Sequence, residues 1–334
     1  MLIQKPLHSI WMPSKLPNKR RKDVEFCTIQ VGNVYFKVHT PTLLPASPVI
    51  ARQLQAYLPT KRTVTLQAPP PPSPRHFEAF LTGVYRQSIP RALQLVTIED
   101  MILIAEMSLN YENNAGAAWA MEGIRNSVDT TQLAADRPLR RASPEVFMRI
   151  LQLFLVFPDA VACESVQSQW LSRLFRRELP PAQAIDFAWR ASGSFDHLLK
   201  HALYVYMIRI QNGEQNVGRL SREQALRVTC GYHSLRVYAS KICMRAPRFR
   251  RSKSCLKHNE CMKTWRMCWA LTVNRPSKVP RVDLLQRLKD AHGELAKDPV
   301  IAQTMHEGCR KGALKSVART RAMISNHLHH HFDL

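Results

Sequence analysis

Glycine is scarce in this chain, with 11 residues among 334. The sequence has no glycine-rich phosphate loop, no Gly-x-Ser-x-Gly turn and no His-Glu-x-x-His helix motif. Such motifs would carry nucleotide binding, serine hydrolysis or zinc proteolysis. Cysteine, histidine and aspartate are all present, but no spacing singles out a nucleophile and its base. The sequence therefore predicts a protein that is not an enzyme and has no small-molecule substrate.

Long apolar runs are also lacking. The longest candidates, near Met101 and Leu151, are interrupted by Glu106 and Pro158 and fall short of the roughly 20 residues of a membrane helix. The N-terminus does not have the charged, apolar and small segments of a signal peptide in that order. Eight cysteines without a secretory signal predict a reducing, intracellular location, in the nucleus or the cytoplasm, and no membrane partner.

Acidic residues are few, since 25 Asp and Glu stand against 48 Lys and Arg, for a net charge of +23. The excess lies at the two ends: residues 1–22 have six basic and no acidic residues, and residues 241–334 have 20 basic and seven acidic ones. Near the N-terminus, four adjacent cations are a nuclear-import candidate, with an unread solvated tail as the alternative. They are Lys19, Arg20, Arg21 and Lys22.

A second basic cluster, between Arg245 and Lys257, has six cations. Such a cluster can neutralise phosphates and thereby bind nucleic acid. Phe249 is its only aromatic residue, whereas binders of single strands interleave several. A solvated basic loop is the alternative interpretation.

The N-terminal third predicts a β-hairpin followed by helices. Residues 24–31 are rich in β-branched and apolar side chains, Gly32-Asn33 suits a tight turn, and the residues from Val34 to Val38 alternate apolar and polar. Thr63 to Leu66 is a candidate third strand. Four signals predict helix starts: Thr40-Pro41, Ser47-Pro48, Ser73-Pro74, and Thr97 with Asp100.

This segment resembles the opening of a BTB/POZ domain. The residues that carry the resemblance are Asp23, the run from Phe36 to His39, Leu43-Leu44 and Ser47-Pro48-Val49, in that order. The resemblance covers residues 23–127, and Ile50 departs from it because the family commonly has an aromatic residue there. It implies a small β-sheet flanked by helices, which self-associates or binds a partner through exposed helices and the first strand.

Residues 128–334 are predicted to be mainly α-helical. The helix signals are Ser143-Pro144, the apolar runs after Trp170, Pro181 and Phe195, and the capping box of Ser221 with Gln224. The run from Phe195 to Tyr206 and that from Gly231 to Leu235 resemble the helical region that follows the BTB domain in a large group of fungal, basidiomycete-type BTB/POZ proteins. The predicted fold class is therefore α+β. Its parts are a basic, disordered arm (1–22), a BTB/POZ domain (23–127) and an α-helical C-terminal region (128–334) with a Cys/His-containing segment (255–309).

This Cys/His segment contains Cys255-x5-Cys261 and, after 44 residues, His306-x2-Cys309. Three thiolates and one imidazole are a tetrahedral ligand set for a structural Zn²⁺ ion. His258, between the first two cysteines, is a competing ligand. Ordinary packing of buried cysteines and a disulfide are the alternatives.

Two neighbouring features have simpler interpretations. Cys268, flanked by Trp265 and Trp269, is predicted to be a core cysteine. The histidines at 327 and 329–331 are expected in a solvated terminus, with weak metal binding as the alternative.

These observations predict a non-enzymatic protein–protein interaction protein. Resemblance to BTB/POZ proteins implies a more specific version, a substrate adaptor that binds a cullin-type ubiquitin ligase. The alternative is a nuclear nucleic-acid or chromatin-associated regulatory factor, which would dimerise through the BTB domain and contact phosphates with its basic ends.

Overall fold

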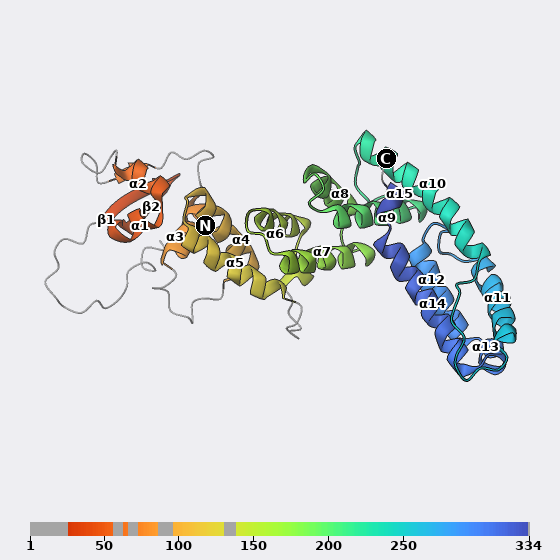
Figure 1. Ribbon diagram of the computed structural model, residues 1–334. Helices are drawn as coiled ribbons and strands as arrows, with labels where there is room; N and C mark the ends of the chain where they lie inside the picture. The colour runs from red at the N-terminus through yellow and green to blue at the C-terminus, as the bar shows by residue number, and fades with distance from the viewer. Residues whose placement is uncertain (1–25, 56–62, 66–72, 86–95, 130–137, 333–334) are drawn as a thin grey trace, which may run out of the picture. The chain divides into compact units, whose positions relative to one another are not determined.

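The computed structural model describes residues 26–55, 63–65, 73–85, 96–129 and 138–332 (Figure 1). The chain divides into two compact units, Met1–Val166 and Gln167–Leu334. The described residues are mostly helical, with one small sheet near the N-terminus, in agreement with the predicted α+β class. Residues 1–22, including the candidate import signal Lys19–Lys22, lie outside the described residues.

The sheet of the first unit has three strands in the order β2-β1-β3. Strands β1 (Phe26–Val31) and β2 (Val34–His39) are antiparallel, and β3 (Thr63–Thr65) is parallel to β1. The predicted hairpin is confirmed, but of its two turn residues only Gly32 has a positive φ, 59°. A turn with glycine at its first central position suffices to reverse the chain here. The core face comes mainly from β1, since Val34 on β2 is 37% exposed.

Helices cover the sheet and extend the first unit. Their bounds are α1 (Thr40–Ala46), α2 (Pro48–Gln55), α3 (Pro74–Tyr85), α4 (Ile98–Asn110), α5 (Asn114–Val128), the 3₁₀ helix η3 (Pro138–Arg140) and α6 (Pro144–Val156). The predicted proline and threonine start signals fall at or beside these helix starts. Phe77, Phe80 and Tyr111 pack their rings together in the core, and Arg149 of α6 donates to Glu106 of α4 at 2.7 Å.

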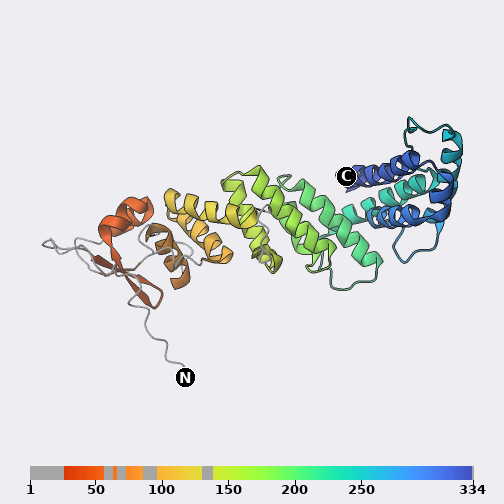
Figure 2. The same cartoon turned by 90° about the horizontal axis from the view of Figure 1, so that it is seen from below.

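Helix α7 (Ala160–Phe175) leads into the second unit, in which the structure describes only helices and connecting segments up to residue 332. The helices are α8 (Pro181–Arg190), α9 (Asp196–Gln211), α10 (Arg222–Met244), α11 (His258–Asn274), α12 (Leu284–Lys297), α13 (Pro299–Thr304), α14 (Glu307–Asn326) and α15 (His329–Phe332). Helices α11 to α14 pack against one another as a group, drawn in blue (Figure 2). Trp265, Cys268 and Trp269 are buried in this group, as predicted.

The C-terminal residues agree only in part with the sequence-based prediction of a solvated tail: His327 and His330 are exposed, but their apolar neighbours are not. Leu328 and Phe332 are buried, and Nδ1 of His331 lies 2.8 Å from the Ser234 hydroxyl. Phe332 rests against Gly231 of α10, where a β-carbon would come within 2.2 Å of the ring. The short α15 therefore docks on α10, because a glycine leaves room for one aromatic side chain.

Candidate metal centre

Three cysteines from separate parts of the second unit meet in its core. Cys255 lies in the segment before α11, Cys261 in the first turn of α11, and Cys309 in the first turn of α14. Their sulfur atoms lie within 4.8 Å of one another, and all three residues are buried. The sequence places Cys255 and Cys309 more than 50 residues apart, so only the packing of α14 against α11 brings them together.

The sulfur spacing suits a metal ion better than a disulfide. The Sγ atoms of Cys255 and Cys261 are 3.9 Å apart. Tetrahedral zinc with Zn–S bonds of about 2.3 Å requires an S–S separation of about 3.8 Å, whereas a disulfide requires about 2.05 Å. All eight cysteines are free thiols. Three buried cysteines therefore lie close enough together to hold a metal ion.

The two histidines offered by the sequence have different surroundings. Nδ1 of His258, at the start of α11, lies 3.6 Å from Sγ of Cys309. Nδ1 of His306 instead accepts a hydrogen bond from the Gly308 N–H at 3.2 Å, and its Nε2 lies 3.3 Å from the Ser254 hydroxyl. His306 thus acts as the N-cap of α14, and both of its ring nitrogens already have partners. His258 is the histidine whose ring faces a cluster thiol.

The cluster thiols accept a hydrogen bond from the backbone and are buried. The N–H of His306 donates to Sγ of Cys261 at 3.4 Å, and hydrogen bonds of this kind orient and tune metal ligands. Burial raises the pKa of the Cys309 thiol, and the Cys255 and Cys261 thiols beside it raise it further. Three thiols packed this closely ionise together only when a cation offsets their charge.

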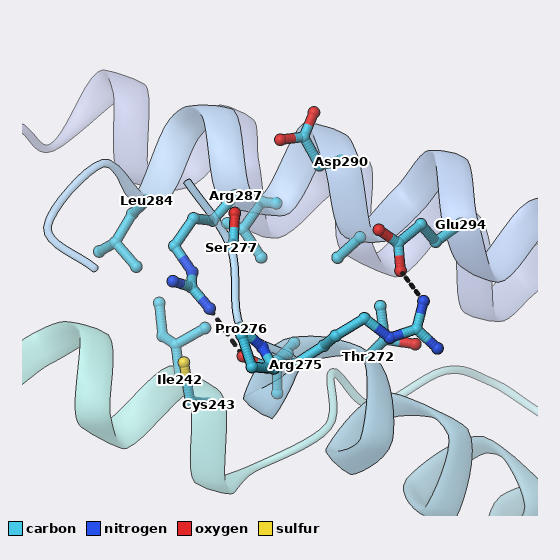
Figure 3. Close-up of a pocket in the computed structure, with 13 residues that line it drawn as sticks. Ile242, Cys243, Thr272, Arg275, Pro276, Ser277, Leu284, Arg287, Asp290 and Glu294 are labelled. Atoms are coloured by element: carbon cyan, nitrogen blue, oxygen red, sulfur yellow. Dashed lines mark hydrogen bonds and ion pairs between the residues drawn. The ribbon is translucent and has the colours of Figure 1, made fainter. Parts of the chain in front are cut away.

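A separate cavity of about 160 Å³ lies between the end of α10, α11 and α12 (Figure 3). Its charged side chains are already engaged: Arg275 pairs with Glu294 at 3.2 Å, and Arg287 donates to the Val273 carbonyl at 2.7 Å. This volume is well below the roughly 300 Å³ at which ligand pockets begin. The cavity gives no argument for a small-molecule substrate.

Comparisons of the chain with protein-family models, curated proteins and solved structures find no match. None of the described helices is both long and apolar enough to cross a lipid bilayer. The spacing in the sequence predicts the three cysteines as metal ligands, and it favours His306 over His258 as the fourth ligand. The signal that favours His258 is its position on α11 beside Cys261, together with the N-cap position of His306 immediately before α14.

Proposed function

We propose that this chain is a non-enzymatic protein–protein interaction protein whose BTB/POZ-like N-terminal region binds a second copy of itself or another protein. The observation that carries the proposal is the outer strand of the sheet. Within the described residues β2 is an edge strand. Val34 and Tyr35, at the start of this strand, are 37% and 52% exposed. An exposed apolar strand edge is a template for pairing with another chain.

The order of elements supports the same proposal. A hairpin, two short helices, a third strand, a helix ending in tyrosine and an alanine-containing helix follow one another, in the order that the BTB/POZ resemblance implies. The tyrosine has a structural reason, since the Tyr85 hydroxyl accepts a hydrogen bond from the backbone N–H of His39 at 3.0 Å. It thereby joins the end of α3 to the end of the hairpin.

Self-association is tested by size-exclusion chromatography with light scattering on the full chain. We expect a mass near twice 38.3 kDa for the wild type and near 38.3 kDa for Val34→Lys/Tyr35→Lys, because charges on an edge oppose strand pairing. The matched control is Leu155→Lys/Val161→Lys, which charges two exposed apolar residues elsewhere in the first unit. A dimer that survives the β2 variant, or is lost equally in the control, contradicts binding through this edge.

The more specific proposal, that the chain is a substrate adaptor of a cullin-type ubiquitin ligase, rests on the family resemblance alone. It predicts that affinity purification of the full chain from cells recovers a cullin. It also predicts that the β2 variant and its control differ in the proteins recovered. Purifications that repeatedly lack a cullin would remove the adaptor version and leave the interaction function in place.

We further propose that the three cysteines bind one structural Zn²⁺ ion with His258 as the fourth ligand. Sulfur and imidazole nitrogen are the donors that zinc prefers, and four protein ligands leave no open position for catalysis. The ion would join the segment before α11, α11 itself and α14. Its role would therefore be to stabilise the second unit, since a site formed only in the folded state adds its binding energy to folding.

Metal content of the purified full chain tests this assignment. We expect about one zinc per chain, lost in Cys261→Ser/Cys309→Ser and reduced in His258→Ala, but retained in His306→Ala. Cys268→Ser is the control, because Cys268 is equally buried but outside the cluster. Zinc that is lost in His306→Ala and retained in His258→Ala would restore the ligand set first predicted from the sequence. A zinc-free wild type would leave the cysteines as core residues.

A further inference from the structure

In the second unit, two stretches that contain basic but no acidic residues pack against each other. Residues 224–259 contain no acidic side chain, and neither do residues 308–332. From the first stretch, residues 245–253 form an irregular segment, here called the basic arm, with Arg245, Arg248, Arg250, Arg251 and Lys253. The second stretch forms most of α14.

The basic arm packs on α14 and is hydrogen-bonded to a tryptophan of α11. At Gly308 of α14, a β-carbon would come within 2.4 Å of the Ser252 hydroxyl oxygen, so the arm crosses the helix where a side chain is missing. One turn further, Gly312 lies next to the Arg250 carbonyl. The indole N–H of Trp265 donates to the Pro247 carbonyl at 3.0 Å. The path of the arm is thus fixed, although it is neither helix nor strand.

The cations of this region face solvent and have few counterions. Arg248 and Arg250 of the arm are exposed, as are Lys315 and Arg319 of α14. Neighbouring cations do pair, Lys257 with Glu260 at 3.8 Å and Lys311 with Glu307 at 2.6 Å. Among the described residues, the four exposed cations form no ion pair.

The four cations form one surface, here called the basic surface. On an α-helix Lys315 and Arg319 share the face of Gly308 and Gly312 because of the 3.6-residue period. They lie about 5 and 10 Å along the axis beyond Gly312, at about 1.5 Å per residue. The arm therefore carries Arg248 and Arg250 across this face, and α14 continues the positive charge beside them.

We propose that the basic surface binds the phosphate backbone of a nucleic-acid duplex without reading its sequence. A DNA duplex has one negative charge for about every 1.7 Å of its axis, so a positive surface of this length meets several phosphates at once. Arginine suits the task because its planar guanidinium group donates two parallel hydrogen bonds to a phosphate. This binding goes beyond the proposed protein-interaction function.

The surroundings favour a duplex over the other anionic partners. Phe249 is half-buried, with its ring edge-on to His258 and Trp265, so it does not offer a face for the base stacking that single strands require. Leu256 is 91% exposed, but one leucine does not make the broad apolar face with which a basic segment enters a membrane.

The test measures binding of the full chain to a fluorescent DNA duplex of about 20 base pairs by anisotropy, between about 50 and 200 mM NaCl. The test variant is Arg248→Gln/Arg250→Gln/Lys315→Gln/Arg319→Gln. The matched control is Arg219→Gln/Arg222→Gln/Arg236→Gln/Lys241→Gln, which removes the same charge from exposed residues at and before α10. Circular dichroism establishes that both variants are folded.

We expect the wild type and the control to bind with affinity that falls steeply with salt. The test variant should bind at least about tenfold more weakly. Its slope of log affinity against log salt concentration should be smaller in magnitude by about four, one for each lost phosphate contact. Binding of an RNA duplex with the same pattern supports the proposal equally.

The proposal is overturned by no binding at the lowest salt, by an equal loss of affinity in both variants, or by a preference for single strands. The proposal also fails if the test substitutions abolish binding to phosphatidylserine vesicles but leave duplex binding unchanged.

Discussion

At the scale of single residues, Gly231 shows how one missing methyl group positions the end of the chain. A β-carbon there would lie 2.2 Å from the Phe332 ring, which is 1% exposed. We expect Gly231→Ala to lower the free energy of unfolding by about 1–3 kcal/mol, the usual effect of overpacking. Chemical denaturation measures the change.

Two further variants make this prediction specific. Gly293→Ala in α12 is the control, because its β-carbon meets nothing within 4 Å, and alanine should stabilise that helix by up to about 1 kcal/mol. In the background of Phe332→Ala, the Gly231→Ala substitution should cost almost nothing, because the clashing ring is gone. Additive effects of the two substitutions would contradict the proposed contact.

His201 makes stability depend on pH at the same scale. Burial lowers its pKa to about 4, although Nδ1–H donates to the His197 carbonyl at 2.9 Å. Below the ordinary pKa of about 6.5, the unfolded chain binds a proton that the folded chain does not. The free energy of unfolding therefore falls as the pH drops from about 6.5 towards 4.

Between about pH 7 and pH 5, we expect His201 to account for a loss of about 2 kcal/mol. Denaturation of the wild type and of His201→Gln at both pH values measures this contribution, since glutamine does not titrate. The wild type should lose more stability than the variant on acidification. Equal losses would mean that the proton reaches His201 in the folded state.

At the scale of helices, the capping box of α10 was readable directly from the sequence. Ser221 Oγ accepts from the Gln224 N–H at 3.2 Å, and the Gln224 side chain accepts from the Ser221 N–H at 2.9 Å. We expect Ser221→Ala to lower the free energy of unfolding by about 1 kcal/mol. Ser221→Asp should retain most of this stability, because an aspartate side chain also accepts a hydrogen bond at the N-cap position. Thermal or chemical denaturation of the wild type and of both variants measures these changes. Equal losses of stability in the two variants would contradict the capping role of Ser221.

The helix starts that the sequence predicts correctly are those marked by residues close to one another in the chain. Ser143-Pro144, Thr97 with Asp100, and Ser221 with Gln224 each involve residues within one turn, and each marks a helix start in the structure. The choice between His258 and His306 depends instead on how α14 packs against α11. The seat of the basic arm on Gly308 depends on the same packing. Contacts between residues about 50 positions apart leave no local pattern in the sequence. The sequence therefore offers several candidate ligands and contacts, and only the fold distinguishes between them.

At the scale of the whole molecule, the two units should respond differently to removal of a metal. All the proposed zinc ligands belong to the second unit. Chelation should therefore increase hydrogen exchange in residues 252–261 and 305–313 by at least about tenfold, which corresponds to about 1.4 kcal/mol of lost protection. Exchange in the sheet and in α3 to α5 should remain unchanged.

Hydrogen exchange with mass spectrometry on the full chain measures both responses in one experiment. Cys309→Ser supplies the decisive comparison, since its second unit should exchange rapidly before any chelator is added and should not change afterwards. If chelation instead raises exchange equally in the variant and the wild type, the chelator acts on the protein by another route. If it affects neither, α11 and α14 are held by packing around Trp265 and Trp269 alone, and the cysteines belong to that core.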